Sequence, residues 1–138
     1  MRNNVTIWQP SNVYKSAILG NGVSVGAFSE IGENVVIGDN TRIGAMVFIP
    51  EKVTIGKNCF VGPKACFSND MFPMQKKEQW QETVVKDGAS IGANVSIRPG
   101  VTIGENSLIG MGSVVCCDIP ANQIWAGNPA KFIRVINA

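Results

Sequence analysis

Large aliphatic residues recur at every sixth position along most of this chain. Steps of six from Ile7 to Val115 mark nineteen positions, and seventeen of them hold an aliphatic residue or Phe. The two exceptions, Pro73 and Gln79, are neighbouring steps. The residue two places before each aliphatic is mostly small or β-branched. The residue after the aliphatic is glycine at ten positions: Gly20, Gly26, Gly32, Gly38, Gly44, Gly56, Gly62, Gly92, Gly104 and Gly110.

This period predicts short strands that turn at regular intervals. A helix needs about 3.6 residues per turn and would lose roughly 1 kcal/mol at each interior glycine. In a strand, residues two apart face the same side, so the aliphatic and the small residue before it both point inward. Glycine suits the turn that follows, because it tolerates positive φ or a close backbone approach. Three such units close a triangular coil of about 18 residues, and stacked coils pair through parallel strands about 4.8 Å apart.

We therefore expect one all-β domain over residues 1–138, with about five or six coils of parallel β-helix in residues 5–67 and 83–117. Residues 68–82 leave the period and predict a protruding loop, although Phe67 and Val85 are eighteen residues apart, so the six-residue phase is kept. Long loops on a regular scaffold commonly carry function. Near the end of the chain, Asn128 as N-cap and Pro129 at the first helical position predict a short helix over about 129–136 that covers the open end of the coils.

Composition narrows the classes of function. The chain has 138 residues and a net charge of +2, which is too balanced for a nucleic-acid or membrane-surface footprint, and no apolar run approaches the roughly 18 residues that cross a bilayer. It has no histidine, which excludes Ser-His-Asp triads, histidine bases and histidine-ligated metals. The four cysteines form no C-x-x-C pair, so we expect no metal and a reduced, cytoplasmic protein.

Two motifs resemble the hexapeptide-repeat acyltransferases, whose β-helix is left-handed. Residues 124–131 (IWAGNPAK) are similar to the C-terminal G-N-P-A-K signature of that family. Residues 67–73 (FSNDMFP) resemble the loop of the nucleotide-linked 3-amino-sugar N-acetyltransferases of O-antigen (lipopolysaccharide) and glycan biosynthesis. The resemblance covers nearly the whole chain. It implies a homotrimer, with acetyl-CoA in the cleft between two subunits and a nucleotide-linked amino sugar held against the loop.

Asn69 and Asp70, in the second motif, are the residues that we expect to hold the acceptor amine. The carboxylate of Asp70 would attract the ammonium form, orient the nucleophile and accept its proton. A sugar amine should have a modest pKa, by analogy with about 7.7–8.0 for an α-amino group, so a strong base is not required. The alternative is structural, because Asn-Asp is common at the start of loops, where both side chains bond to nearby backbone.

Three further residues are candidates for binding the acceptor. Phe72 and Trp80 are aromatic residues of the loop, and Trp80 is expected to stack on a base or to form a wall of the sugar pocket. Lys64 is a candidate contact for a diphosphate, and it stands in a stretch where many relatives carry histidine. The alternatives are packing of Trp80 onto the coils and a solvated surface lysine at position 64.

The candidates for binding acetyl-CoA lie at two coil turns and near the C-terminus. Backbone N–H groups at the turns would stabilise the oxyanion of the tetrahedral intermediate, and basic side chains would bind CoA phosphate. These candidates are Gly92-Ala93, Gly110-Met111, Lys131 and Arg134. The glycines also have a purely structural explanation as turn residues, and the two basic residues have one in solubility and in the helix dipole.

The sequence leaves two other functions open. One is an acetyltransferase for another amino sugar or small amine. The other is a noncatalytic β-helical module that serves as an oligomerisation scaffold or binds a sugar. A pure scaffold does not need Asn69-Asp70 or the G-N-P-A-K end, and these features favour the enzyme.

Overall fold

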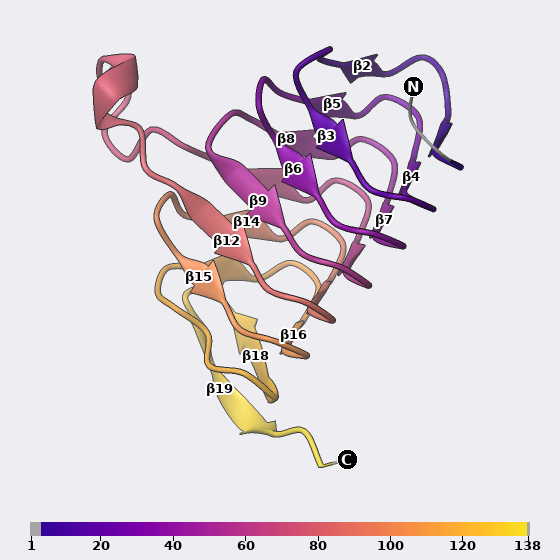
Figure 1. Ribbon diagram of the computed structural model, residues 1–138. Coiled ribbons are helices and arrows are strands. Elements are labelled where there is room, and N and C mark those ends of the chain that lie inside the picture. The colour runs from indigo at the N-terminus through magenta and orange to yellow at the C-terminus, as the bar shows by residue number, and fades with distance from the viewer. Residues whose placement is uncertain (1–3, 138) are drawn as a thin grey trace.

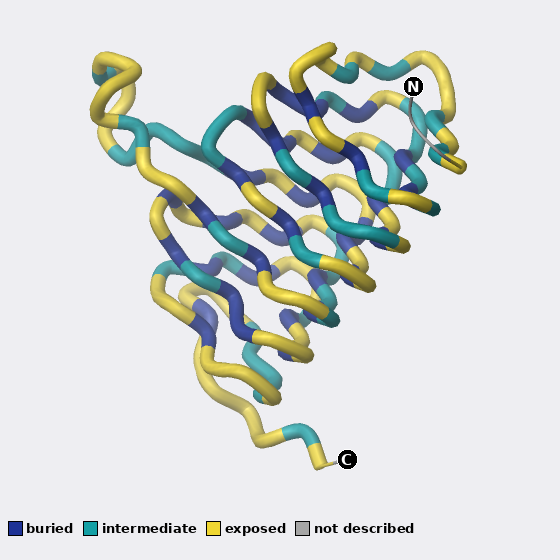
Figure 2. The backbone as a smooth tube through the Cα atoms, in the orientation of Figure 1, coloured by how far each residue is buried: buried dark blue, intermediate teal, exposed yellow. Residues whose placement is uncertain are grey.

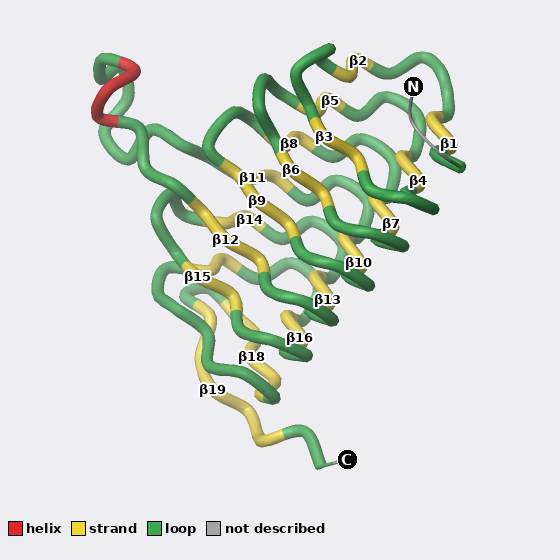
Figure 3. The backbone as a smooth tube through the Cα atoms, in the orientation of Figure 1, coloured by secondary structure: helices red, strands yellow, loops and turns green. Residues whose placement is uncertain are grey.

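The six-residue period becomes a stack of three-sided coils (Figure 1). The structure, a computed structural model, describes residues 4–137. Each repeat contributes one strand of two or three residues followed by a turn, as Figure 3 shows. The strands β1 to β17 make five complete coils and two sides of a sixth. This confirms the predicted parallel β-helix.

The strands of successive coils line up in three sheets, one for each side of the prism. The eight-stranded sheet contains β1 (Thr6–Ile7), β4 (Ser24–Val25), β7 (Arg42–Ile43), β10 (Phe60–Val61), β13 (Ser90–Ile91), β16 (Leu108–Ile109), β18 (Gln123–Gly127) and β19 (Ala130–Val135). The six-stranded sheet contains β2 (Asn12–Val13), β5 (Glu30–Ile31), β8 (Phe48–Ile49), β11 (Cys66–Phe67), β14 (Ser96–Ile97) and β17 (Val114–Val115). The five-stranded sheet contains β3 (Ile18–Leu19), β6 (Val36–Ile37), β9 (Val53–Ile55), β12 (Thr83–Val85) and β15 (Thr102–Ile103).

The periodic aliphatic residues form one core along the axis of the prism. Residues such as Ile31, Ile49 and Ile91 are fully buried, and Phe67 is the largest of the fully buried side chains. Figure 2 shows the resulting alternation of buried and exposed segments around each coil. Small polar residues in the core are satisfied locally, because the hydroxyl of Thr41 donates to the carbonyl of Gly56 at 2.7 Å. The first coil is the least covered, and Ile7 and Val13 are only partly buried.

The glycine after each aliphatic is required for close approach between coils and not for positive φ. A Cβ built on Gly38 would lie 2.6 Å from the carbonyl carbon of Gly56 in the next coil. A Cβ on Gly92 would lie 2.6 Å from the backbone nitrogen of Met111. Positive φ falls two residues further on, where asparagine is the most frequent residue and follows five of the ten glycines, as at Asn34 and Asn94. Asparagine tolerates this left-handed conformation better than most residues do. The structure therefore supports close backbone approach, and not positive φ, as the reason for these glycines.

The loop at residues 68–82 is an insertion into a single corner. Val25 pairs with Ile7, eighteen residues earlier, but Val85 pairs with Ile55, thirty residues earlier. The coil that carries the loop is therefore twelve residues longer than the others. Phe67 and Val85 lie on adjacent sides of the prism, so their separation of eighteen residues is not one full coil. The loop contains one turn of 3-10 helix, η1 (Lys77–Gln79), and projects from the coils (Figure 1).

The predicted helix over 129–136 is wrong, because the C-terminal segment is a β-hairpin. Strand β18 continues the eight-stranded sheet by pairing in parallel with β16, and β19 pairs antiparallel with β18. Within this segment, Phe132 makes a cross-strand contact. The rings of Trp125 and Phe132 meet edge to face with centroids 6.4 Å apart, and Trp125 also packs against the core. The β-branched residues Ile133 and Val135 suit a strand that can extend an existing sheet edge.

Candidate acceptor and cofactor sites

The turns between the six-stranded and the five-stranded sheets stack polar residues on one edge of the prism, which we call the loop corner. It consists of residues 14–17, 32–35, 50–52, the loop 68–82 and residues 98–101. Glu33, Glu51 and Asn69 are successively eighteen residues apart, so they occupy the same position in three consecutive coils. Stacked strands are about 4.8 Å apart, and the two carboxylates are therefore neighbours.

The base of the loop is fixed by hydrogen bonds to the coil beneath it. The side-chain amide of Asn69 donates to the carbonyl of Glu51 at 2.9 Å, and the N–H of Gln81 donates to the carbonyl of Asn69 at 2.8 Å. Inside the loop, Oδ2 of Asp70 accepts from the N–H of Gln75 at 3.0 Å. These bonds use one side-chain group of Asn69 and one of Asp70 for structure, as the alternative interpretation of this dipeptide expected.

Two polar atoms of the loop are buried without a hydrogen-bond partner among the described residues. They are Oδ1 of Asp70 and Nε1 of Trp80. A buried polar atom left without a partner costs roughly 1–3 kcal/mol, so native proteins rarely leave one unsatisfied. These atoms are therefore available to bond with a group that enters from outside this chain.

A pocket of about 350 Å³ lies between the loop and the coils. Its lining combines three carboxylates with three aromatic side chains and one lysine, and contains Tyr14, Glu30, Gly32, Glu33, Phe48, Pro50, Glu51, Asn69, Lys77 and Trp80. Three carboxylates against one lysine give it a net negative charge. Such a pocket favours a ligand that carries a positive charge and an apolar or ring-shaped body.

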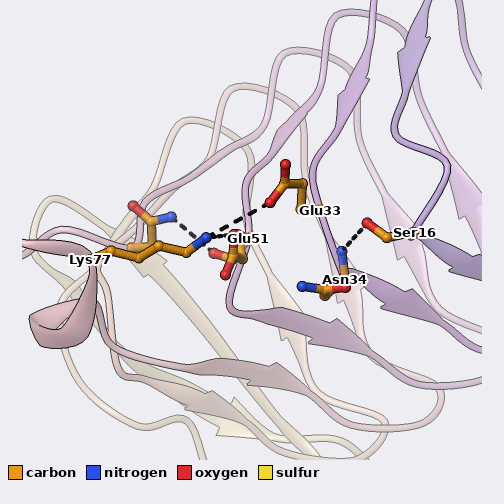
Figure 4. A network of polar contacts seen from close by, with 6 residues as sticks. Ser16, Glu33, Asn34, Glu51 and Lys77 are labelled. Atoms are coloured by element: carbon orange, nitrogen blue, oxygen red, sulfur yellow. Dashed lines mark hydrogen bonds and ion pairs between the residues drawn. The ribbon is translucent and has the colours of Figure 1, made fainter.

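The lysine of the pocket pairs with the stacked carboxylates (Figure 4). Nζ of Lys77 lies 3.0 Å from Oε1 of Glu51 and 3.8 Å from Oε2 of Glu33. The hydrogen bond and charge of Glu51 raise the pKa of Lys77 above its usual value, and Glu33 adds to this. The side chain of Glu51 is only 14% exposed, whereas that of Lys77 is 56% exposed. Lys77 therefore reaches into the pocket from the solvent side as an ammonium ion.

The structure brings only some of the acceptor candidates to this pocket. Asn69 and Trp80 line it, whereas Asp70, Phe72 and Lys64 are not among its lining residues. Asp70 is the neighbour of Asn69 in the base of the loop, and Phe72 is exposed on the loop. Lys64 lies at a different edge of the prism, in the turn between β10 and β11.

The acetyl-CoA candidates gather along that other edge. The turns between the eight-stranded and the six-stranded sheets form what we call the Ala93 corner, which contains residues 8–11, 26–29, 44–47, 62–65, 92–95 and 110–113. The N–H of Gly92 donates to the carbonyl of Ile109 at 2.9 Å, and that of Gly110 donates to the carbonyl of Trp125 at 2.9 Å. Both glycine donors are therefore already used between coils. The N–H groups of Ala93 and Met111 bond to no group of residues 4–137 and are the donors that remain.

The C-terminal hairpin brings one basic candidate to the Ala93 corner. Ala126 lies against Gly110, since a Cβ on that glycine would be 2.9 Å from the Cβ of Ala126. Lys131 pairs with Ala126 across the hairpin and so lies at the same edge. Arg134 pairs with Ile124, two residues further from that edge, and its guanidinium donates to the carbonyl of Val135 at 3.2 Å.

Glu33, Glu51 and Lys77 are site residues that the sequence interpretation missed. The signal for the two glutamates was present, because each lies a whole number of eighteen-residue coils before Asn69. Lys77 has no such signal, since its position depends on the path of the loop.

Two classes of site are absent from the part of the chain that the structure describes. No group of three or more Cys, Asp or Glu side chains there is placed to hold a metal ion. No helix within residues 4–137 has the length and apolar character needed to cross a membrane.

Solved structures of proteins that bind CoA or acetyl coenzyme A share this fold. PerB from Caulobacter crescentus, solved with CoA and GDP-perosamine, is 28% identical with a TM-score of 0.84, and the match covers 96% of this chain and 58% of that protein. The acetyltransferase domain of PglB from Neisseria gonorrhoeae, solved with acetyl coenzyme A, is 26% identical with a TM-score of 0.84, covering 96% and 58%. This chain thus spans less than two thirds of the length of these relatives.

One difference from the Caulobacter protein concerns histidine. That protein was also solved with one histidine replaced by asparagine and by alanine, again with CoA and GDP-perosamine. The present chain contains no histidine. Any role that the histidine has there must fall to other groups here or be dispensable.

The repeats of this chain match a known family model. No curated protein matches the chain. The model of the bacterial transferase hexapeptide (six repeats) matches residues 16–51, 34–69 and 82–117, which together make up more than half of the chain. These segments are the same coils that the structure stacks into a prism, so the chain belongs to the bacterial transferase hexapeptide family.

Proposed function

We propose that this protein is an acetyl-CoA-dependent N-acetyltransferase that acts on the amino group of a nucleotide-linked sugar, with the amine at C3. The observation that carries the proposal is the negatively charged pocket under the loop, where Asn69, Glu51 and Trp80 meet. The similar structures of PerB and PglB, solved with CoA or acetyl coenzyme A, support the acyl donor. The PerB complex with GDP-perosamine supports a nucleotide-linked amino sugar as acceptor.

The charge of the pocket indicates which end of the acceptor enters it. A nucleotide-linked amino sugar carries a cationic amine at one end and an anionic diphosphate near the other. Because Glu30, Glu33 and Glu51 outnumber Lys77, the amine is attracted into the pocket and the diphosphate is repelled from it. The aromatic rings of Phe48 and Trp80 provide apolar surface for the sugar ring.

The reaction needs a neutral amine, an oriented thioester and a route for one proton. The amine nitrogen attacks the carbonyl carbon of the thioester, the C–S bond breaks, and CoA leaves as the thiol after it takes up a proton. Oδ1 of Asp70 accepts no hydrogen bond from the described residues, and Asp70 follows the pocket residue Asn69. It is therefore our candidate to accept the proton of the amine once the acceptor has displaced the side chains that bury this oxygen. Orientation can provide up to roughly 7–11 kcal/mol of the lowering of the barrier, which reduces the need for a strong base.

The candidate donors for the oxyanion are the N–H groups of Ala93 and Met111. The N–H groups of Gly92 and Gly110 hold successive coils together, and the next residue in each turn keeps its donor unpaired within the described chain. A backbone donor that is fixed by the coils costs little reorganisation when charge develops on the oxygen. Lys131 at the same edge is our candidate for a phosphate of CoA.

A complete site needs a second copy of the chain. The acceptor pocket lies at the loop corner and the acetyl-CoA candidates lie at the Ala93 corner, with the six-stranded sheet between them in one chain. A symmetric homotrimer in which the Ala93 corner of one copy faces the loop corner of the next would bring the two sets together. Exposed apolar residues on and beside this sheet, Phe28, Met46 and Phe48, provide contact surface.

The direct test is turnover with a panel of acceptors. The protein is incubated with acetyl-CoA and with GDP-perosamine, dTDP-linked and UDP-linked 3-amino and 4-amino sugars, and release of CoA thiol is measured. We expect turnover with at least one nucleotide-linked amino sugar and none with the matching sugar that carries hydroxyl in place of the amine. If no acceptor is used and neither CoA nor acetyl-CoA stabilises the protein to heat, the protein is a scaffold and the proposal is rejected.

Two variants test the roles in the loop. Asp70→Asn removes the carboxylate and leaves a side chain of the same size, and we expect kcat to fall by about 10²-fold, within the range for a lost proton acceptor. Asn69→Ala removes the bond to Glu51 as well as a pocket group, and we expect a higher KM for the acceptor. Near-normal rates in both variants would remove these residues from the site.

A complementation experiment tests the shared site. Asn69→Ala weakens acceptor binding, so its acceptor side is nearly inactive when the acceptor is kept far below the raised KM, and Gly110→Trp blocks the acetyl-CoA side. If each site takes one side from each of two neighbouring chains, trimers assembled at random from equal amounts of both variants should have about a quarter of their sites intact. If one chain formed the whole site, the mixture would be as inactive as either variant alone.

A further inference from the structure

The pocket already holds a primary ammonium ion, that of Lys77. Its Nζ lies 3.0 Å from Oε1 of Glu51. Of the two carboxylates that pair with Lys77, that of Glu51 is less exposed than that of Glu33. An alkyl ammonium ion on a flexible stem has the same charge and hydrogen-bond donors as a protonated amino group on a sugar. The structure therefore shows, with a side chain of its own, where the pocket binds such a group (Figure 4).

We propose that Lys77 is a tethered competitor for the amine of the acceptor: it occupies the ammonium subsite at Glu51 and Glu33 in the empty enzyme and is displaced when the acceptor binds. This inference rests on the proposed function, because it needs the acceptor amine to enter this pocket. Lys77 would then set the affinity and selectivity of the pocket for its acceptor. A ligand without a cationic amine would have to break the ion pair of Lys77 with Glu51 and would form no new ion pair in its place.

The geometry allows the exchange without opening the loop. The base of the loop is held by Asn69 and Gln81, and the strand that follows begins with the N–H of Thr83 donating to the carbonyl of Lys52 at 2.9 Å. None of these bonds involves Lys77. The Lys77 side chain is 56% exposed, so it can turn into water and remain solvated. Ion pairs of such exposure are weak, which makes displacement inexpensive.

Loss of Lys77 should change KM for the acceptor in opposite directions, depending on whether Lys77 competes with the acceptor or holds the loop. If Lys77 competes with the acceptor, Lys77→Met leaves the carboxylates unpaired and the acceptor binds more tightly. We expect KM for the acceptor to fall about two- to fivefold, the range that an exposed ion pair supports. If Lys77 instead holds the loop closed over the substrate, its loss raises KM.

The matched control is Lys76→Met. Lys76 is the preceding residue, is exposed and makes no ion pair with any described residue. The Lys76→Met variant removes the same charge from the same loop. Its KM therefore shows how much the loss of a loop charge alone changes binding of an anionic nucleotide. The measurements are KM and kcat for GDP-perosamine, or for the acceptor that the panel identifies, at low and high salt. The difference between Lys77→Met and wild type should shrink as salt screens the ion pair, while Lys77→Arg should restore the wild-type KM.

A second measurement observes the lysine itself. The side-chain NMR signal of Lys77 should shift when Glu51→Gln removes its partner, and should shift in the same direction when the acceptor is added to the wild-type protein. Turnover with an unchanged or raised KM in Lys77→Met, or a Lys77 signal that does not respond to the acceptor, overturns the inference alone. No turnover in wild type and in both lysine variants overturns the proposed function and the inference with it.

Discussion

Replacing Gly38 by alanine tests the reason for the periodic glycines. The added Cβ would lie 2.6 Å from the carbonyl carbon of Gly56 and 2.7 Å from the nitrogen of Lys57, both backbone atoms of the next coil. Ordinary contact begins at 3.4 Å, so the two coils must separate by about 0.8 Å at this point. The N–H of Gly38 donates to the carbonyl of Ile55 at 2.8 Å, and that separation would stretch the bond beyond hydrogen-bond range.

The expected loss of stability follows from these two effects. Overpacking a tight contact costs typically about 1–3 kcal/mol, and a lost hydrogen bond about 0.5–1.5 kcal/mol. The unfolded chain loses entropy when glycine becomes alanine, which returns about 0.4–1 kcal/mol. We therefore expect Gly38→Ala to lower the free energy of unfolding by about 2 kcal/mol and the midpoint of thermal unfolding by roughly 6–10 °C.

Gly112→Ala provides the control for positive φ. Gly112 has φ of +72°, and a Cβ there would meet nothing within 4 Å. Its cost is that of a left-handed alanine, about 1 kcal/mol, before the same gain from the unfolded chain. Both variants are compared with the wild type by circular dichroism melts and urea titration at equal protein concentration. If Gly38→Ala is no more destabilising than Gly112→Ala, close approach between coils is not what these glycines serve.

Three further predictions concern the core, a thiol and the hairpin. Phe67 is fully buried, so Phe67→Ala should cost about 3–5 kcal/mol in urea titration, whereas Phe60→Ala on the outside of β10 should cost far less; equal losses would contradict the assigned core. Burial raises the pKa of the Cys59 thiol, which keeps it protonated at pH 8. Cys66 and Cys117 are exposed, so the test uses a variant with Cys66, Cys116 and Cys117 replaced by serine. A disulfide reagent should react with Cys59 only after this variant unfolds, and rapid labelling of the folded variant would refute this. Phe132→Ala removes the edge-to-face contact with Trp125 and should cost about 0.5–1.5 kcal/mol beyond the loss of buried area, with hydrogen exchange increasing in β19 before any other strand.

The coils were predictable because their signal is local and repeated. Each repeat places an aliphatic inward, a small residue two places before it and a glycine after it, and burial of the aliphatic decides the outcome in the same way each time. Asn69 and Trp80 were predictable as pocket residues because they stand where the period fails. The sequence predicted glycine at the turns but not its cause, because both positive φ and close backbone approach favour glycine over other residues.

The hairpin and the pocket depend on contacts that no local pattern contains. Residues 130–135 form a strand because β18 offers them an edge and Trp125 offers Phe132 a partner, and neither is visible in the segment itself. The contact of Lys77 with Glu51 joins residues separated by an entire loop, and it exists because twelve extra residues fold back over an earlier coil. The sequence by itself determined the prism, its core and the position of its one interruption, because burial repeats every six residues. Only the tertiary structure decided which charged groups the interruption brings together, because that depends on the path of the loop in space.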